Sequence, residues 1–326
     1  MRCACSYVIL LSLLIFSSCE KDAPLPTPDP DPEWPALFVA GYIPHWGMAN
    51  FDETALKHLN RVYYFSLAPD VDGQFIVHDR DHQNLSKLNE SVKSTNCELY
   101  IVLGGWYESE NIHAMASTAE KRQAYITALV QLCKTYDLDG VDLDWENYPF
   151  PFDINDFIDL VNELSLALAA NGLGFTVALD VLHYDLATQI INQVDAINLM
   201  LYGMLDDAGN HATFNHMVDG LTPYLNNQIP KDKLIVGVPF YGKRPWDEND
   251  TSPRAVTYRY IVEQSFPSPD MNKYQKYAFN GRALLKAKVE YLRKNEFYGI
   301  MSWELSQDVE YVSQYSLLRS IVKAND

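Results

Sequence analysis

Residues 139–146 have the sequence Asp-Gly-Val-Asp-Leu-Asp-Trp-Glu, in which acidic and apolar side chains alternate. Successive side chains of a β-strand point to opposite faces, so this stretch predicts a strand with Asp142, Asp144 and Glu146 on one face. Its apolar side chains lie on the other face, where we expect them to pack against helices. We expect the acidic face to line the interior of a barrel and to lead toward its C-terminal mouth.

Seven other β-rich runs accompany this strand, and segments with helical periodicity separate them. Strands are expected at 37–42, 61–66, 98–103, 140–145, 174–179, 196–200, 234–239 and 298–303. Helical periodicity is clearest at 119–136, 154–170 and 283–295. Several strands are continuous apolar runs, which is typical of parallel strands buried on both faces. These units predict an α/β fold, a (β/α)8 TIM barrel. A doubly wound open sheet is the alternative, but no G-x-G-x-x-G follows the first strand.

The barrel is expected to be a single domain that occupies residues 36–326. Its longest irregular stretch, residues 243–280, follows the seventh strand. Loops at that end of a barrel strand lie on the catalytic face, so we expect this modest insertion to shape a cleft wall. The insertion is too short and too rich in Pro and polar residues for a full extra domain.

The N-terminal residues predict export and a lipid anchor. Residues 1–18 are interpreted as a lipoprotein signal peptide, with a positive charge at Arg2 and an apolar run at 7–16 that is too short to span a bilayer. Small residues before Cys19 resemble a bacterial lipobox, although Phe16 replaces the usual aliphatic residue; an ordinary secretory signal is the alternative. Residues 19–35 form a Pro-rich linker after the lipidated Cys19. We therefore expect a cell-envelope protein, lipid-anchored at the outer membrane or cell surface of a bacterium.

Composition limits the partners. With 25 basic and 43 acidic residues the net charge is −18, which disfavours nucleic acid as a partner. We expect no metal and no cofactor, membrane contact only through the lipid anchor, and a monomer. Cys97 and Cys133 are no disulfide framework. Two buried thiols are the preferred interpretation, and a bridge between them is the alternative.

The three acids of the central strand predict general acid chemistry. Carboxylates about 6.6 Å apart along one face repel one another when all are ionised. At least one pKa should therefore rise, and protons should be shared. A carboxylic acid still protonated near neutral pH is suited to general acid catalysis. The alternatives are a Ca²⁺ or Mg²⁺ site, or acids paired with basic residues. EF-hand loops lack this apolar alternation, and no Lys or Arg lies between Lys134 and Lys231.

Residues 139–146 also fit every fixed position of D-G-x-D-x-D-x-E, and here the chain resembles family 18 glycoside hydrolases. This family contains the chitinases and the endo-β-N-acetylglucosaminidases, and D-G-x-D-x-D-x-E is its fourth-strand signature. Other barrel strands resemble the family at 41–46, 103–106, 200–202, 237–242 and 299–304. Two positions depart from the family pattern: Val102 replaces the usual Ser, and Gly203 replaces an Asp or Asn. The second change removes a polar contact to the substrate unless Asp206 or Asp207 reaches the site.

The resemblance implies a role for each residue at the strand ends. Glu146 would protonate the leaving glycosidic oxygen, and Asp144 would orient and charge-stabilise the substrate's 2-acetamido group. Asp142 would share a proton with Asp144, and Tyr202 would hydrogen-bond the acetamido oxygen. That oxygen would attack the anomeric carbon to form an oxazolinium ion, so no enzyme carboxylate is the nucleophile. Five further residues would line the sugar site: Trp303, Met200, Tyr42, Gly105 and Trp106.

Three functions follow from this resemblance. The first is a retaining, endo-acting hydrolase of β-1,4-linked N-acetylglucosamine, chitin or its oligosaccharides, acting on a glycan that contains N-acetylglucosamine. The second is an endo-β-N-acetylglucosaminidase that cuts the chitobiose core of N-glycans. The third is an inactive, sugar-binding member of the family. The short insertion at 243–280 implies a shallow cleft, which is typical of endo-type cutting.

Overall fold

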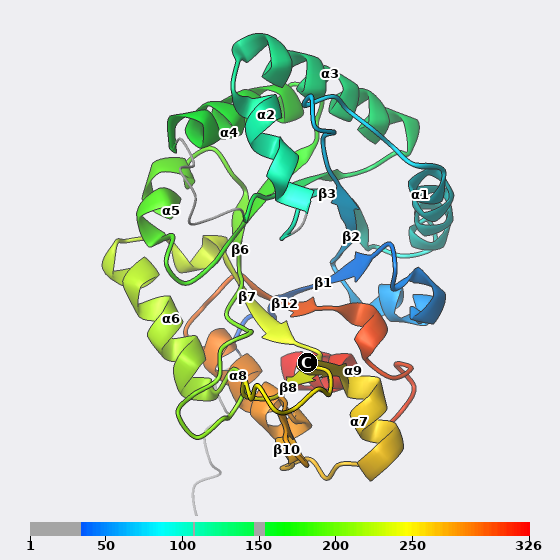
Figure 1. Ribbon diagram of the computed structural model, residues 1–326, viewed down its shortest axis with the longest axis vertical. Coiled ribbons are helices and arrows are strands. Elements are labelled where there is room, and N and C mark those ends of the chain that lie inside the picture. The colour runs from blue at the N-terminus through cyan, green and yellow to red at the C-terminus, as the bar shows by residue number, and fades with distance from the viewer. Residues whose placement is uncertain (1–33, 107, 147–153) are drawn as a thin grey trace, which may run out of the picture. The chain divides into compact units, whose positions relative to one another are not determined.

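The computed structural model describes residues 34–106, 108–146 and 154–326. Eight parallel strands close into a barrel in the order β1-β12-β7-β6-β5-β4-β3-β2 (Figure 1). Their bounds are β1 Phe38–Pro44, β2 Arg61–Leu67, β3 Glu98–Gly104, β4 Gly140–Asp144, β5 Gly174–Leu179, β6 Ala196–Leu199, β7 Leu234–Pro239 and β12 Gly299–Trp303. Each overlaps a strand predicted from the sequence, and the predicted (β/α)8 TIM barrel is confirmed.

Helices surround the barrel and alternate with its strands (Figure 1). Those outside the insertion are α1 Asp79–Val92, α2 Ile112–Ala116, α3 Ala119–Thr135, α4 Ile154–Ala169, α5 Tyr184–Ile190, α6 Phe214–Asn226, α8 Arg282–Lys294 and α9 Leu317–Asn325. Short 3₁₀ turns lie at Met48–Asn50, Glu53–His58, Glu108–Asn111, Lys231–Lys233 and Leu305–Gln307. The three helices predicted from periodicity are confirmed to within one residue at each end.

Helix α4 shows why the sequence folds in this way. Its buried residues Phe157, Leu160, Val161, Leu164 and Leu168 recur at helical spacing and form one stripe that faces the barrel. Polar caps define the starts of other helices, because a side-chain oxygen there satisfies a backbone N–H that has no partner inside the helix. Thr118 accepts from the N–H of Lys121 at the start of α3, and Thr213 accepts from the N–H of His216 at the start of α6.

The strand β4 separates two apolar layers. Val141 and Leu143 are fully buried between the sheet and the helices, as predicted from the alternation. The opposite face of the sheet encloses a second cluster inside the barrel, which includes Tyr42, Tyr63 and Tyr100. The acids of β4 therefore rise through an interior that is otherwise mainly aromatic and aliphatic.

A buried arginine lies in this interior, at the N-terminal end of the strands. The guanidinium of Arg61 on β2 lies 3.7 Å from the ring centroid of Tyr100 and 2.6 Å from a carboxylate oxygen of Glu98. Its charge is thus balanced by a carboxylate and by the π-face of an aromatic ring. This arrangement closes the barrel at the end opposite to its mouth.

The insertion after β7 is more ordered than the sequence analysis predicted. It contains a small antiparallel sheet in the order β10-β11-β8-β9, together with one helix. The elements are β8 Tyr241–Lys243, β9 Ala255–Thr257, α7 Tyr258–Ser265, β10 Lys273–Tyr274 and β11 Tyr277–Ala278. The interpretation of residues 243–280 as irregular was therefore wrong. Strands of two or three residues are too short to show an alternating pattern.

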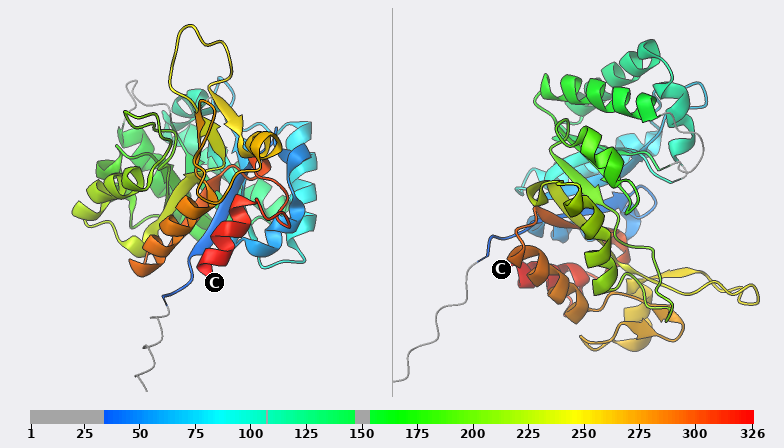
Figure 2. Two further views of the ribbon diagram at one scale, coloured as in Figure 1. Left: turned by 90° about the horizontal axis from the view of Figure 1, so that it is seen from below. Right: turned by 90° about the vertical axis from the view of Figure 1, so that its left-hand side faces the viewer.

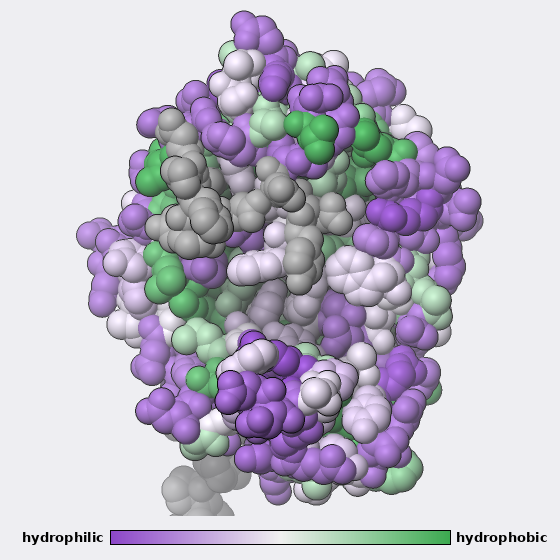
Figure 3. Space-filling view, viewed as in Figure 1, coloured by the Kyte–Doolittle hydropathy of each residue, from purple (hydrophilic) through white to green (hydrophobic). Residues whose placement is uncertain are grey.

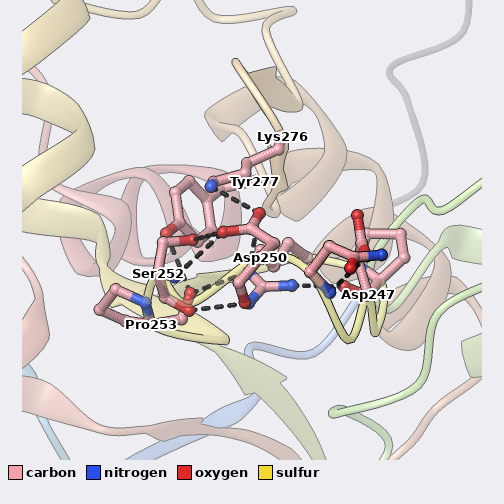
Figure 4. Close-up of polar contacts among 9 residues, drawn as sticks. Asp247, Asp250, Ser252, Pro253, Lys276 and Tyr277 are labelled. Carbon is pink, nitrogen blue, oxygen red and sulfur yellow. Dashed lines mark hydrogen bonds and ion pairs between the residues drawn. The ribbon is translucent and has the colours of Figure 1, made fainter.

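The loop between β8 and β9 projects from the barrel (Figure 2) and is held by a buried arginine. The guanidinium of Arg244 donates to the carbonyl oxygens of Pro245, Asp250, Ser252 and Pro253. The Asp250 carboxylate in turn lies 2.6 Å from the ammonium of Lys276 (Figure 4). The projection is therefore fixed by charge-assisted hydrogen bonds, although it has little regular secondary structure.

The predictions for the N-terminal segment remain predictions. The signal peptide, Cys19 and nearly all of the Pro-rich linker fall at residues 1–33, outside the described residues. In the described part of the chain, no helix combines the length and apolarity needed to cross a membrane. Cys97 and Cys133 are both free and buried, as the preferred interpretation held.

Candidate active site

Asp142 is fully buried in the barrel and accepts three hydrogen bonds. Its Oδ2 accepts from the hydroxyl of Tyr42 at 2.7 Å. Its Oδ1 accepts from the hydroxyl of Thr176 at 2.6 Å and from the side-chain amide of Asn198 at 2.9 Å. Burial raises the pKa of Asp142, and the three donors partly offset this effect. The donors come from β1, β5 and β6, so they fix this carboxyl group from three strands. Its sharing of a proton with Asp144 stays a prediction.

Asp144 ends the strand and has one oxygen without a partner. Its side chain is buried, and Oδ1 makes no hydrogen bond to any described residue. Burial, followed by the charges of Glu146 and Asp142, raises the pKa of Asp144 well above its usual value. The backbone is held more firmly, because its carbonyl oxygen accepts from the N–H of Gly105 at 2.6 Å and from the hydroxyl of Ser109 at 3.1 Å. A fixed strand end thus presents a carboxyl oxygen that a substrate group can engage.

Glu146 lies two residues further along, at the mouth of the barrel, and is partly exposed. Its backbone N–H donates to the hydroxyl of Ser109 at 3.0 Å. Burial, followed by the negative charge of Asp180, raises the pKa of Glu146 to about 7, against a weaker lowering by the backbone N–H of Trp106. A large fraction of this carboxyl group is therefore protonated near neutral pH. It can give a proton to a group bound in the cleft.

Two predicted residues reach the site from the segment that follows β6. Burial and the charges of Asp144 and Glu146 raise the pKa of Tyr202 well above its usual value, so its hydroxyl keeps its proton. A Cβ added at Gly237 of β7 would lie 2.6 Å from the Tyr202 ring, so this glycine makes room for the ring. Met200 lines the same pocket as Glu146. The roles predicted for Tyr202 and Met200 remain predictions.

Gly203 stands where the family has an Asp or Asn, and neither Asp206 nor Asp207 takes over the role of that side chain. The carboxylate of Asp206 accepts from the N–H groups of Ala208 and Asn210 and from the Asn210 side chain, so it is held in its own turn. Asp207 is exposed. The carbonyl oxygen of Gly203 instead accepts a hydrogen bond from the ammonium of Lys243. This position therefore presents backbone and a cation to the surroundings.

Aromatic rings from three strands form an apolar floor beside the acids. Trp303 ends β12, and its ring centroid lies 5.6 Å from that of Tyr42 and 4.7 Å from that of Phe65. Tyr42 stacks on Tyr63 with ring centroids 4.6 Å apart. Tyr42 is buried and contacts Asp142, so it supports the acids from below. Trp303 is only half-buried and is the ring of this group that a sugar can reach.

Of the two predicted residues Gly105 and Trp106, the first is required by the packing and the second lines the cleft. Gly105 has φ +106°, and a Cβ there would lie 2.1 Å from the ring of Phe65. This position therefore requires glycine. Trp106 is 62% exposed and lines the pocket that contains Glu146. Its indole ring is available for stacking against a sugar.

The pocket at Glu146 lies at the C-terminal ends of β4 and β5. Figure 3 shows that the molecule is hollowed on the face turned toward the viewer. The walls of the pocket combine the exposed ring of Trp106, the buried ring of Trp145, aliphatic side chains and two carboxyl groups. The lining residues are Trp106, Trp145, Glu146, Ala178, Leu179, Asp180, His183, Leu186 and Met200.

Sequence analysis missed four residues that the structure places at or below this pocket. Thr176 and Asn198 fix Asp142, Phe65 supports Trp303, and Asp180 faces the pocket. Alternation along the fifth predicted strand places Thr176 and Asp180 on one face, which is a usable signal. Asn198 shares its face with Met200 and Tyr202 in the same way. Nothing in the local sequence marks Phe65.

No metal centre accompanies the acids among the described residues. Within residues 34–106, 108–146 and 154–326, no group of three or more His, Cys, Asp or Glu side chains is arranged to hold an ion. The carboxyl groups are instead surrounded by hydroxyl and amide donors and by one another.

Eight parallel strands closed into a barrel, with a row of carboxyl groups at the end of the fourth strand, are typical of glycosidases that have a barrel fold. The sequence profile described as glycosyl hydrolases family 18 matches residues 39–308. The chain therefore belongs to family 18 of the glycoside hydrolases.

Related proteins agree with this assignment. An endochitinase of Manduca sexta is 29% identical over 207 residues, which cover 53% of this chain and 36% of that protein. Endochitinase 1 of Metarhizium robertsii is 25% identical over 280 residues, covering 69% of this chain and 63% of that protein. The chain thus spans about a third to two thirds of the length of these relatives. The crystal structure of the chitinase ChiB of Flavobacterium johnsoniae superposes with a TM-score of 0.76 at 26% identity, covering 90% of this chain and 94% of that one.

Proposed function

We propose that the protein is a retaining, endo-acting hydrolase that cleaves chitin or chito-oligosaccharides by substrate-assisted catalysis. The observation that carries the proposal is the difference in surroundings between two acids, Glu146 and Asp144. Glu146 has a pKa of about 7 and lies in an open pocket, whereas Asp144 is buried with an unpartnered oxygen. One group is suited to proton transfer and the other to holding a substrate group.

The first chemical step follows from this arrangement. The carboxyl group of Glu146 gives its proton to the glycosidic oxygen while the bond from that oxygen to the anomeric carbon breaks. The acetamido carbonyl oxygen of the same sugar forms a bond to the anomeric carbon, giving an oxazolinium ion. The raised pKa of Asp144 favours its protonated form, so Asp144 passes its proton to Asp142, and the unpartnered oxygen of the resulting carboxylate accepts the acetamido N–H. Its negative charge then offsets the positive charge that develops there. In this proposal the hydroxyl of Tyr202 donates a hydrogen bond to the acetamido oxygen.

The second step returns the enzyme to its starting state. Water attacks the anomeric carbon from the face that the leaving group vacated, and the Glu146 carboxylate takes the proton of that water. The ring of the oxazolinium ion opens, and the acetamido group is restored. Two displacements at one carbon retain its configuration, so the new reducing end is the β-anomer.

Chitin is the preferred substrate class because the related proteins reported above are named chitinases and endochitinases. The half-buried ring of Trp303 and the exposed ring of Trp106 support a pyranose chain above the acids. For location, we propose a lipid-anchored protein of the cell envelope, on the strength of Cys19 and the Pro-rich segment that follows it.

The substitution Glu146→Gln tests the proposal, because it keeps the shape of the side chain but removes the proton. General acid catalysis contributes about 10²–10⁴-fold, so turnover of a β-1,4-linked N-acetylglucosamine oligomer should fall at least ~100-fold while the oligomer still binds. Glu90→Gln, on the exposed face of α1, is the matched control and should keep full activity. Activity of Glu146→Gln within threefold of wild type would reject the assignment. A parallel digest of a high-mannose glycopeptide tests the N-glycan alternative, which predicts release of that glycan instead.

A further inference from the structure

Asp180 lies directly after β5, beside Glu146. The strands β4 and β5 are parallel neighbours that pair Asp142 with Thr176 and Leu143 with Val177. Continuing this register by three positions brings Glu146 opposite Asp180. Neighbouring strands are about 4.8 Å apart, so facing side chains at one level lie within reach of each other's charge.

Both side chains face the same interior. Asp142 and Thr176 point inward, because the Thr176 hydroxyl donates to the Asp142 carboxylate. Alternation then points Glu146 and Asp180 inward at the mouth. Both residues line the pocket described above.

The carboxylate of Asp180 is held in its ionised form by its own turn. The Nδ1 atom of His183 lies 2.9 Å from Oδ1 of Asp180, and the backbone N–H of Leu182 donates to the same oxygen at 2.7 Å. Partial burial raises the pKa of Asp180, but these donors outweigh it and leave the pKa below its usual value. The hydroxyl of Tyr224 on α6 donates to the Asp180 carbonyl oxygen and anchors the backbone. Asp180 is therefore an anion at a pH where Glu146 is still protonated.

Other groups that face Glu146 come from each neighbouring element. Asp144 lies beneath it on β4, Tyr202 approaches from the end of β6, and the backbone N–H of Trp106 approaches from the end of β3. His183 lies in the turn after β5. Among these described groups, Asp144 is part of the same row of acids along β4 as Glu146, Tyr202 is neutral, and Trp106 contributes only the dipole of its N–H. Asp180 is the fixed anion of the set.

We propose that Asp180, held by His183, is a positioning residue that keeps Glu146 protonated and so sets the alkaline limit of catalysis. The inference rests on the proposed role of Glu146 as the general acid. An anion beside Glu146 destabilises the glutamate form, so loss of the proton needs a higher pH. Removing the anion lets Glu146 lose its proton at lower pH, and the acid form is then depleted earlier as pH rises.

The test is the pH profile of kcat/KM on an N-acetylglucosamine oligomer for wild type and Asp180→Asn. The substitution keeps the size of the side chain and removes its charge. The alkaline limb should move to lower pH by about one unit, the shift expected when a nearby like charge is removed. Asp180→Glu keeps the charge and should restore the limb toward its wild-type position. Asp185→Asn, on the exposed side of α5, removes the same charge outside the pocket and should leave the profile unchanged.

A second measurement reports on Glu146 without turnover. Carbon-13 NMR of labelled glutamate carboxyl groups, assigned by comparison with Glu146→Gln, should show a lower pKa of Glu146 in Asp180→Asn than in wild type. An unmoved carboxyl titration, or an equal shift in Asp185→Asn, overturns the inference even when Glu146→Gln is inactive. Full activity of Glu146→Gln instead rejects the proposed function, so the two failures are distinguishable.

Discussion

The hydroxyl of Tyr42 donates a 2.7 Å hydrogen bond to the carboxyl group of Asp142 and so joins β1 to β4 inside the barrel. Tyr42 and Asp142 lie 100 positions apart in the chain, and their bond helps to fix the acid that lies deepest in the barrel. The bond orients Asp142 beneath Asp144, whose upper neighbour Glu146 faces the pocket. The geometry of the acids on β4 thus depends on strands that contribute no acid of their own.

Removing this donor should impair catalysis without unfolding the protein. Tyr42→Phe leaves Asp142 with its two other donors and keeps the stacking on Tyr63. Without this bond Asp142 is held less firmly beneath Asp144, and a displacement of the acids costs more in the transition state than in the free enzyme, so kcat/KM should fall by about tenfold. Steady-state kinetics on an N-acetylglucosamine oligomer measure the effect.

The matched control is Tyr125→Phe on α3. The Tyr125 hydroxyl is buried and has no hydrogen-bond partner among the described residues, so its loss should leave activity unchanged. Equal activity of both variants would show that the Tyr42 hydroxyl has no part in catalysis.

The nucleophile is tested by changing both the enzyme and the substrate. Asp144→Asn keeps the shape of the side chain but cannot offset positive charge on the acetamido group, so cleavage of acetylated oligomers should fall by at least ~100-fold. A matched oligomer with a deacetylated sugar at the cleaved bond should bind wild type but scarcely be cut. NMR of the fresh product should show the β-anomer. Release of the α-anomer, or efficient cutting after a deacetylated sugar, contradicts the substrate-assisted mechanism.

Alternation along residues 139–146 was sufficient to predict β4 and the direction of its acids. Side chains of a strand alternate between two faces, so burying the apolar side chains against the helices leaves only the opposite face for the acids. It could not identify Thr176 and Asn198 as partners of Asp142. Which residues meet at one level inside a barrel depends on the stagger between strands, and local sequence does not encode that stagger.

The insertion shows a second limit of the sequence. The projecting loop between β8 and β9 is held by the buried guanidinium of Arg244, which donates to the carbonyl oxygens of Pro245, Asp250, Ser252 and Pro253. No periodic pattern accompanies such an arrangement. The predicted small size of the insertion was correct in the sense that it adds one short helix and strands of two or three residues.

Membrane attachment is expected to depend on Cys19. With Cys19→Ala the protein should move from the membrane fraction to the soluble fraction, and labelling with radioactive palmitate should disappear, because stable anchoring needs a multiply acylated residue. Cys5→Ala, which changes another cysteine of the predicted signal, should leave both the fractionation and the label unchanged. Wild-type protein found soluble and unlabelled would show that the signal is an ordinary secretory one.

A buried carboxyl group beyond the active site is expected to control stability. Asp308 follows the turn after β12, is 4% exposed and accepts four hydrogen bonds. The donors are the N–H groups of Val309, Leu317 and Leu318 and the hydroxyl of Ser316. It thereby ties the end of the last barrel strand to the first turn of α9, where helical N–H groups have no partner inside the helix.

Asp308→Ala would leave these donors buried and unpaired, so the free energy of unfolding should fall by about 3 kcal/mol. Asp308→Asn keeps one acceptor oxygen and should lose less. The exposed Asp207→Ala is the control, and its effect should stay within about 0.5 kcal/mol. Urea unfolding followed by tryptophan fluorescence measures all three.

Because Asp308 lies outside the pocket at Glu146, kcat/KM measured well below the unfolding transition should be unchanged in each variant. A loss of activity without a loss of stability in Asp308→Ala would place this residue in the catalytic machinery instead.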